Sequence, residues 1–131
     1  MPCAPGAVGV TNAVRAGELI DRSPSDVTLQ RVGTINIVII ITNAALAVSA
    51  MVTAVRVATE GKAAALLAKR IPSWTGRSDA TGTGTDAVVI ANGNGPLIRY
   101  SGTPHTRIGE LIGRLVNRGV ERELRTLTLS P

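Results

Sequence analysis

A long run without formal charge is the feature that most constrains how this chain can fold. Residues 32–55, between Arg31 and Arg56, contain no Asp, Glu, Lys or Arg, and a run of this length can be scored as a membrane span. Its internal order favours another interpretation, because the β-branched block 37–41 is followed by a polar break and then by an alanine-rich stretch. A buried strand that leads into a helix accounts for this order better than a membrane helix does.

The length and composition indicate one domain over 1–131. With 131 residues and 44% hydrophobic side chains, the chain can build one core but not two. Trp74 and Tyr100 are its only aromatic residues, so the core has to be packed from aliphatic side chains, as in layered helices and sheet. We therefore expect an α/β (α+β layered) fold, with a mixed sheet of about four to five strands packed with two long helices.

Periodicity and turn residues place these elements along the chain. Strands are predicted in the segments 6–14, 34–41 and 87–91, with a turn-rich loop at 21–26. One helix is predicted from Asn43 or Ala44 to about Arg70, ended by the following proline, and another from Ile108 to near Arg125. The Asn-Gly-Asn-Gly sequence at 92–95 predicts a hairpin, so that the segment from 96 or 97 to 101 returns antiparallel beside 87–91. Gly109 and Gly113 are expected to let the second helix approach the sheet closely.

The first predicted helix has an apolar stripe that also carries polar residues. At 100° per residue, this stripe holds Val48, Met51, Val52, Val55 and Leu66. Thr59 and Lys62 fall on it and are expected to face inward, whereas Glu60 points away. A lysine in such a place either extends its ammonium to water or is held inward for a purpose.

The positive charge does not indicate nucleic-acid binding. The net charge is +5 and the pI is near 10.7, but the densest group of arginines, between Arg107 and Arg125, is interleaved with glutamates, as on a solvated helix face. Cys3 is the only cysteine, which excludes an intrachain disulfide and a thiolate metal cluster. The first ten residues do not resemble a signal peptide. We expect a cytoplasmic protein, with no nucleic-acid or membrane partner.

Two segments could carry chemistry. His105, the only histidine, precedes the last predicted helix, where the helix dipole favours the neutral imidazole that acts as a general base; it could equally be a turn residue that caps backbone groups. The run Thr81-Gly82-Thr83-Gly84-Thr85-Asp86 could turn its N–H groups towards an oxyanion or phosphate, or be an ordinary tight turn. Asp86 could orient His105, activate water or cap the loop. One histidine cannot build the usual multi-histidine zinc site, so we name no metal ligands and do not expect a zinc hydrolase mechanism, while an ion bound by carboxylates stays open.

Several short segments in one order resemble the adenosylcobinamide amidohydrolase (CbiZ) family. They are Gly33-Thr34-Ile35-Asn36, Ala58-Thr59-Glu60-Gly61-Lys62, the run from Thr81 to Asp86, Gly102-Thr103-Pro104-His105-Thr106 and Gly109-Glu110-Leu111-Ile112-Gly113. The upstream segments Gly9-Val10-Thr11-Asn12-Ala13 and Arg15-Ala16-Gly17 are also similar. The resemblance covers almost the whole chain.

The resemblance implies hydrolysis of the amide that joins aminopropanol to the corrin of adenosylcobinamide, giving adenosylcobyric acid for cobamide salvage. The cobalt ion would arrive inside the corrinoid substrate, so no cofactor is expected. His105, Asp86 and Glu60 are the expected catalytic residues, and the expected substrate-binding residues are Asn36, Thr59, Lys62, Thr81, Gly82, Thr83, Gly84, Thr85 and Thr106. The nucleophile is left open between water, which we prefer, and a threonine. A non-catalytic corrinoid- or nucleotide-binding module is the alternative, and homo-oligomerisation stays open.

Three departures from the family pattern are visible. Gly61 stands where the family more often has alanine, which is expected to weaken the helix by roughly 1 kcal/mol. Pro104 interrupts a turn that is more usually Gly-Thr-His-Thr and affects how His105 is placed. Family members generally carry more sequence upstream, so this chain resembles the later part of the domain or a short form of it.

Overall fold

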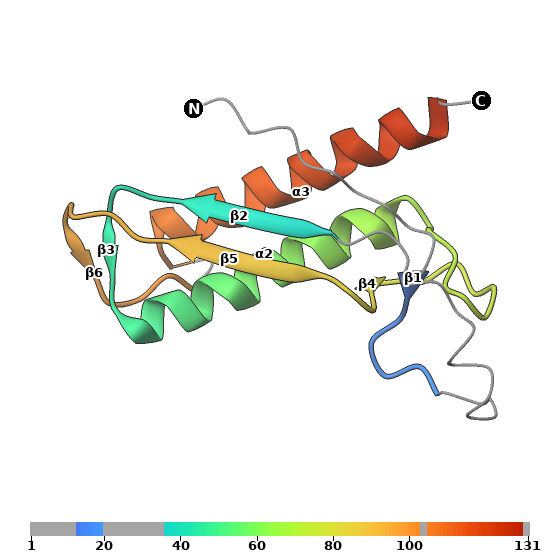
Figure 1. The fold of residues 1–131 in the computed structure, drawn as a ribbon, viewed down its shortest axis with the longest axis horizontal. Coiled ribbons are helices and arrows are strands. Elements are labelled where there is room, and N and C mark those ends of the chain that lie inside the picture. The colour runs from blue at the N-terminus through green and yellow to red at the C-terminus, as the bar shows by residue number, and fades with distance from the viewer. Residues whose placement is uncertain (1–12, 20–35, 103–104, 130–131) are drawn as a thin grey trace.

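The computed structural model describes residues 13–19, 36–102 and 105–129, and the elements below refer to these residues (Figure 1). Two helices, α2 (Val48–Ala68) and α3 (Arg107–Leu129), pack on each other and on short strands. The strands are β1 (Ala13–Val14), β2 (Ile37–Ile41), β3 (Ala45–Leu46), β4 (Gly82–Thr83), β5 (Ala87–Ala91) and β6 (Leu97–Ile98). The α+β class, the two long helices and the mixed strand directions expected from the sequence are confirmed.

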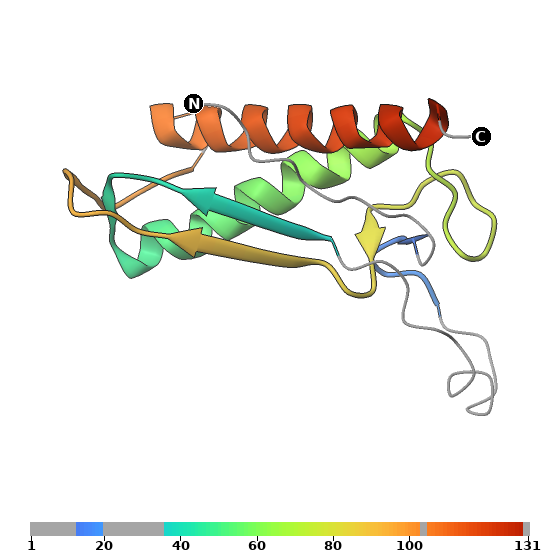
Figure 2. The same cartoon turned by 45° about the horizontal axis from the view of Figure 1, so that its top comes forward.

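The strands form three small pairs rather than one sheet. β2 and β5 pair in parallel over five residues, β3 and β6 pair in parallel, and β1 and β4 pair antiparallel. The helices cover one side of the β2–β5 pair (Figure 2). Side chains of alternate residues on these two strands, Val38, Ile40, Val88 and Ile90, pack against the core, whereas Ile37, Ile39 and Val89 on the other face are exposed.

The predicted hairpin at 92–95 is wrong. The segment after this turn, β6, pairs with β3 and not with β5, because the turn amides find partners in the chain ahead of β3. Gly93 N–H donates to the carbonyl of Ala44 (3.0 Å) and Gly95 N–H to that of Asn43 (2.6 Å). A Cβ at Gly93 would lie 2.5 Å from the Asn43 carbonyl oxygen, so glycine is required here by close approach of two backbones.

The first helix begins later than predicted because backbone groups ahead of it belong to β3. Ala45 N–H donates to Pro96 and Ala47 N–H to Ile98, both at 2.9 Å, so α2 begins only at Val48. It ends at Ala68, near the predicted end. The second helix runs from Arg107 to Leu129, slightly beyond the predicted range.

The core lies mainly between the two helices. Most of its α2 residues are alanines, with Ala50, Ala54 and Ala58 fully buried beside Val57 and Leu66. The α3 residues of the core are larger aliphatic side chains, namely Ile112, Val116, Val120 and Leu124. Alanine on one helix allows the other to come close, and larger side chains on the partner then fill the space.

The glycines of α3 contact other elements than predicted. A Cβ at Gly113 would touch Val57 of α2 at 3.5 Å, and one at Gly109 would lie 2.3 Å from the Ser101 carbonyl oxygen. They therefore allow close approach to a helix and a loop, not to the sheet.

The expected stripe of α2 is buried only in part, since Leu66 lies in the core and Met51 packs against it. Val48, Val52 and Val55 are exposed, because the alanine-rich face centred on Ala54 and Ala58 turns inward instead. Thr59 is also exposed, against expectation, and its hydroxyl donates to the carbonyl of Val55 (2.8 Å).

Some predictions fall outside the described residues. These are most of the strand predicted at 6–14, the loop at 21–26, and residues 34–35 of the strand predicted at 34–41. Among the described helices, none combines the length and apolarity needed to cross a bilayer.

Candidate functional site

Asp86, the residue before β5, is the centre of a buried polar cluster. Its Oδ2 forms an ion pair with Nζ of Lys62 from α2 and accepts the backbone N–H of Thr83 (3.0 Å). Its Oδ1 accepts the Thr83 hydroxyl and Nδ2 of Asn36 (2.8 Å). The side chains of Lys62 and Asp86 are each 12% exposed. One carboxylate thus joins α2, β4 and the residue before β2.

These contacts decide the charge state of Asp86. Burial alone would raise the pKa of its carboxyl group, but hydrogen bonds from Lys62, Thr83 and Asn36 outweigh burial and hold this pKa below the usual value of 3.8. The carboxylate is therefore ionised at neutral pH. Its four hydrogen-bond donors also fill about the number of acceptor positions that a carboxylate has.

The glycine-threonine turn is shaped around this ion pair. A Cβ at Gly82 would lie 2.6 Å from Oδ2 of Asp86 and 2.8 Å from Nζ of Lys62, so only glycine lets the pair lie against the backbone. The hydroxyl of Thr83 also accepts hydrogen bonds from Nδ2 of Asn36 (3.3 Å) and from Thr85 N–H (3.4 Å). The anion that the turn surrounds is its own Asp86, so this carboxylate caps the loop, which is one of the roles that the sequence allows. Binding of a substrate oxyanion or phosphate there stays a prediction.

Some of the backbone N–H groups at Gly82–Thr85 that the sequence predicts for an oxyanion are used within the cluster instead. The N–H groups of Thr83 and Thr85 donate inside the cluster, and Gly84 is exposed. Thr81 lies outside the cluster, since its hydroxyl accepts the N–H of Ala16 (2.8 Å) beside β1.

The expected convergence of His105 with the turn is wrong. His105 is exposed and precedes α3, which begins at the end of the molecule where β3 and β6 lie, whereas β4 and the start of β5 lie at the other end (Figures 1 and 2). The neighbouring Ser101 donates its hydroxyl to the carbonyl of Ala50 (2.6 Å). Ala50 and Lys62 are twelve residues apart on α2, or about 18 Å.

Thr106 and Glu60 also lie apart from the cluster. The hydroxyl of Thr106 accepts the N–H of Gly109 (3.1 Å) and donates to the carbonyl of Gly102 (2.8 Å). Thr106 therefore caps the start of α3. Glu60 is exposed and pairs with Arg56 (3.5 Å) on its own helix. Of the three expected catalytic residues, only Asp86 is in the cluster.

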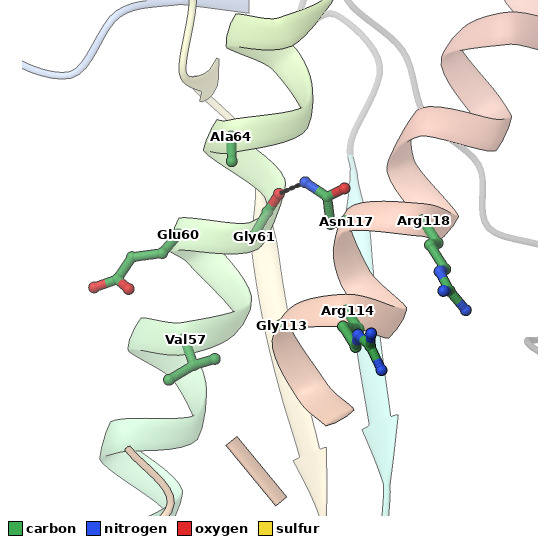
Figure 3. Close-up of a pocket in the computed structure, with 8 residues that line it drawn as sticks. All are labelled: Val57, Glu60, Gly61, Ala64, Gly113, Arg114, Asn117 and Arg118. Carbon is green, nitrogen blue, oxygen red and sulfur yellow. Dashed lines mark hydrogen bonds between the residues drawn. The ribbon is translucent and has the colours of Figure 1, made fainter. Parts of the chain in front are cut away.

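Glu60 is at the edge of a shallow groove between the helices, and its carboxylate points away from α3 (Figure 3). The groove encloses about 390 Å³, and Nδ2 of Asn117 on α3 donates across it to the carbonyl of Gly61 on α2 (3.1 Å). Its other lining residues are Val57, Ala64, Gly113, Arg114 and Arg118.

A second polar cluster lies near the turn, between the segment after β1 and the loop after α2. Glu18 accepts the hydroxyls of Thr75 and Ser73, the latter at 2.9 Å. The hydrogen bond from Thr75, with those from Arg15 N–H and Ser73, holds the pKa of Glu18 below its usual value. A hollow of about 370 Å³ is lined by this glutamate, Arg15 and Arg77 among others. The sequence did not indicate this cluster beyond the Arg15-Ala16-Gly17 resemblance.

Comparison with known proteins identifies the family. The model of the adenosylcobinamide amidohydrolase family matches residues 4–128, almost the whole chain. The chain belongs to this family. The membership confirms the resemblance seen in the sequence, and the polar cluster around Asp86 is built from segments that carried it.

A relative is found in Methanocaldococcus jannaschii, in a protein named only as uncharacterised. It is 42% identical over 92 residues, which are 70% of this chain and 35% of that protein. The chain thus spans about a third of the length of this relative. No solved structure matches the chain.

Proposed function

We propose that the chain is an adenosylcobinamide amidohydrolase that cuts the aminopropanol amide of its substrate at the Lys62–Asp86 pair. The observation that supports this most is the family match over residues 4–128, together with a buried ion pair formed by two residues of the family-like segments. Buried charges cost folding free energy, and they are common at sites that perform chemistry.

In this proposal Lys62 receives the carbonyl oxygen of the amide. Among the described residues, Lys62 uses one of the three N–H donors of its ammonium group, the one that meets Asp86. A remaining donor can stabilise the negative charge that develops on the carbonyl oxygen during attack. Asp86 holds this ammonium group in place.

The attacking group in this proposal is water, and Thr83 relays its proton. The Thr83 hydroxyl donates to Oδ1 of Asp86, so it can pass its proton to the carboxylate and take one from water once that water replaces one of the two long hydrogen bonds that it accepts, from Asn36 (3.3 Å) and Thr85 (3.4 Å). The carbon–nitrogen bond then breaks, the water oxygen stays on the carbonyl carbon, and the proton leaves with the amine. The products are adenosylcobyric acid and aminopropanol, and the cobalt ion stays within the corrinoid.

The second candidate is a corrinoid-binding module without turnover. It is favoured by one observation, that hydrogen bonds from Lys62, Thr83 and Asn36 already occupy about all the acceptor positions of the Asp86 carboxylate. A carboxylate held in this way can serve folding alone.

Incubation of the purified protein with adenosylcobinamide separates the two candidates. We expect aminopropanol and adenosylcobyric acid to appear in equal amounts, measured by chromatography with mass detection. Binding of the corrinoid by a folded protein, without either product, would favour the module.

A further inference from the structure

Asn36, the residue before β2, belongs to the Asp86 cluster but has no step of its own in the mechanism above. It is only 7% exposed, and a buried amide group needs partners inside the protein. Its Nδ2 donates to Oδ1 of Asp86 (2.8 Å) and to the hydroxyl of Thr83 (3.3 Å). Because an ionised carboxylate only accepts hydrogen bonds, the atom of Asn36 that faces Asp86 has to be the donor Nδ2.

The pairing of β2 with β5 brings Asn36 beside Asp86. The first paired residues of these parallel strands are Ile37 and Ala87, so the residues directly before them are neighbours across the pair. Ala87 N–H donates to the carbonyl of Asn36 (2.8 Å), which extends the ladder by one step. The backbone of a paired strand therefore holds the Asn36 side chain against the carboxylate.

The Asn36 amide also decides where the proton of Thr83 points. A hydroxyl group has one hydrogen and two acceptor positions, and Thr83 accepts from Asn36 Nδ2 (3.3 Å) and from Thr85 N–H (3.4 Å). With both positions occupied, the hydrogen points to Oδ1 of Asp86. The bond from Thr85 is the longer one and Thr85 is less buried than Asn36, so attacking water replaces this bond more easily. The bond from Asn36 then still directs the Thr83 proton to the carboxylate.

We propose that Asn36 is a positioning residue of the reaction, which holds Oδ1 of Asp86 and directs the Thr83 proton to it. This inference rests on the proposed function, because it assigns Asn36 to the transfer of a proton from water. It differs from the role that the family resemblance implies, which is contact with the substrate. Loss of a positioning residue lowers kcat, whereas loss of a substrate contact weakens the binding of the corrinoid.

Asn36 should also affect the pH at which Asp86 takes up a proton. Among the described residues that contact this carboxylate, Lys62 of α2 is charged, whereas Thr83 of β4 and Asn36 are neutral. Burial raises the pKa of Asp86, and the hydrogen bonds from Lys62, Thr83 and Asn36 lower it. Removal of the Asn36 donor should therefore raise this pKa, which a change that only loosens the packing should not do.

The test compares Asn36→Leu with Asn92→Leu, each shown to be folded by circular dichroism. Leucine is close to asparagine in size and cannot donate a hydrogen bond. Asn92 is the matched control, because its amide also joins two segments, through the N–H (3.2 Å) and carbonyl (3.0 Å) of Leu46, at the end of the molecule away from Asp86. Asn36→Ser, which removes the amide and keeps a polar side chain, serves as a second variant where leucine impairs folding.

We expect the Asn36 variants to lower kcat at least about tenfold, because part of the contribution of proton transfer is lost. The Kd for adenosylcobinamide, measured by equilibrium dialysis, should stay within about twofold. The pKa of the Asp86 carboxyl group, followed by carbon NMR, should rise. Asn92→Leu should leave kcat and Kd within about twofold of the unaltered chain and the pKa of Asp86 unchanged.

The contrary results are distinct. An unchanged kcat would overturn the positioning role, and a raised Kd beside it would make Asn36 a substrate contact instead. A lower kcat with an unmoved Asp86 pKa would assign Asn36 to folding alone, which also overturns the proposal. In these cases the unaltered chain still forms product and the proposed hydrolysis stands. A folded, unaltered chain that binds the corrinoid and gives no product would contradict the hydrolysis, and with it the role of Asn36 in proton transfer.

Discussion

At the scale of residues, the chemistry of this chain concentrates on Asp86 and its partners. The sequence pattern has Lys62 facing inward and allows Asp86 to cap its loop, and both features are present. No local pattern links the two residues, because they are 24 residues apart on a helix and a distant turn, and only the family resemblance places Lys62 at one site with the turn. The partner that the sequence pattern suggests for Asp86 is His105, since both are candidates for one reaction.

Thr83 tests the proposed proton relay. Thr83→Ser keeps the hydroxyl that donates to Asp86, so we expect kcat within about tenfold of the unaltered enzyme. Thr83→Val keeps the shape without the hydroxyl, and we expect kcat to fall at least about 100-fold. Steady-state assays of product release measure both, and an active Thr83→Val enzyme would exclude the relay.

Asp86 should also affect stability in a pH-dependent way. Its pKa is lower in the folded chain than the usual 3.8, so the ionised form stabilises the fold above that value, and this contribution is lost as pH falls through the lowered pKa. Asp86→Asn leaves the partly buried Lys62 without its partner and should lower the free energy of unfolding by about 2 kcal/mol at pH 7, between the values for exposed and fully buried pairs.

Denaturant unfolding from pH 7 down to pH 3 measures this difference. The gap between the two proteins should be constant near neutral pH and shrink below about pH 4. A gap that widens in acid would mean that the carboxylate does not stabilise the folded chain.

At the scale of elements, the helices follow from periodicity more closely than the strands do. The boundaries of α3 agree with the apolar repeat from Ile108 onward, whereas the start of α2 moves because Ala45 and Ala47 donate to the segment after the Asn-Gly turn. That turn has a strong local hairpin signal, and tertiary hydrogen bonds to Asn43 and Ala44 override it. Contacts of this kind cannot be read from a local pattern.

Gly61 lies where α2 contacts α3, and its replacement tests how closely the two helices pack. From propensity alone, Gly61→Ala should strengthen α2 by roughly 1 kcal/mol. The structure reverses this expectation, because a Cβ at Gly61 would lie 2.9 Å from the Gly113 carbonyl oxygen. Forcing the helices apart should cost more than propensity gains, and we expect a net loss of about 1–2 kcal/mol.

Gly119→Ala is the matched control for this prediction. Gly119 is also inside a helix, but a Cβ there would meet nothing within 4 Å, so alanine should stabilise α3 by up to about 1 kcal/mol. Thermal unfolding of the two variants should therefore give shifts of opposite sign, and a gain in both would show that the helix crossing tolerates a methyl group.

At the scale of the whole molecule, the two parallel strand pairs decide where the site lies. β2 and β5 start at one end of the molecule, directly after Asn36 and Asp86, and α2 returns along them to bring Lys62 to the same end. The loop with His105 connects β6 to α3 at the other end (Figure 1). Composition and periodicity predict the class of the fold. The distance between the Asp86 cluster and His105 depends on how the strands pair, and the sequence pattern predicts that pairing wrongly.

The central claim is that the Lys62–Asp86 pair, and not His105, performs the reaction. The most direct test is turnover of adenosylcobinamide by Asp86→Asn, Lys62→Met and His105→Ala, each shown to be folded by circular dichroism at the assay temperature. We predict that the first two lose at least about 100-fold in kcat, and that His105→Ala stays within about threefold of the unaltered chain. An inactive but folded His105→Ala protein beside an active Asp86→Asn protein would contradict the account.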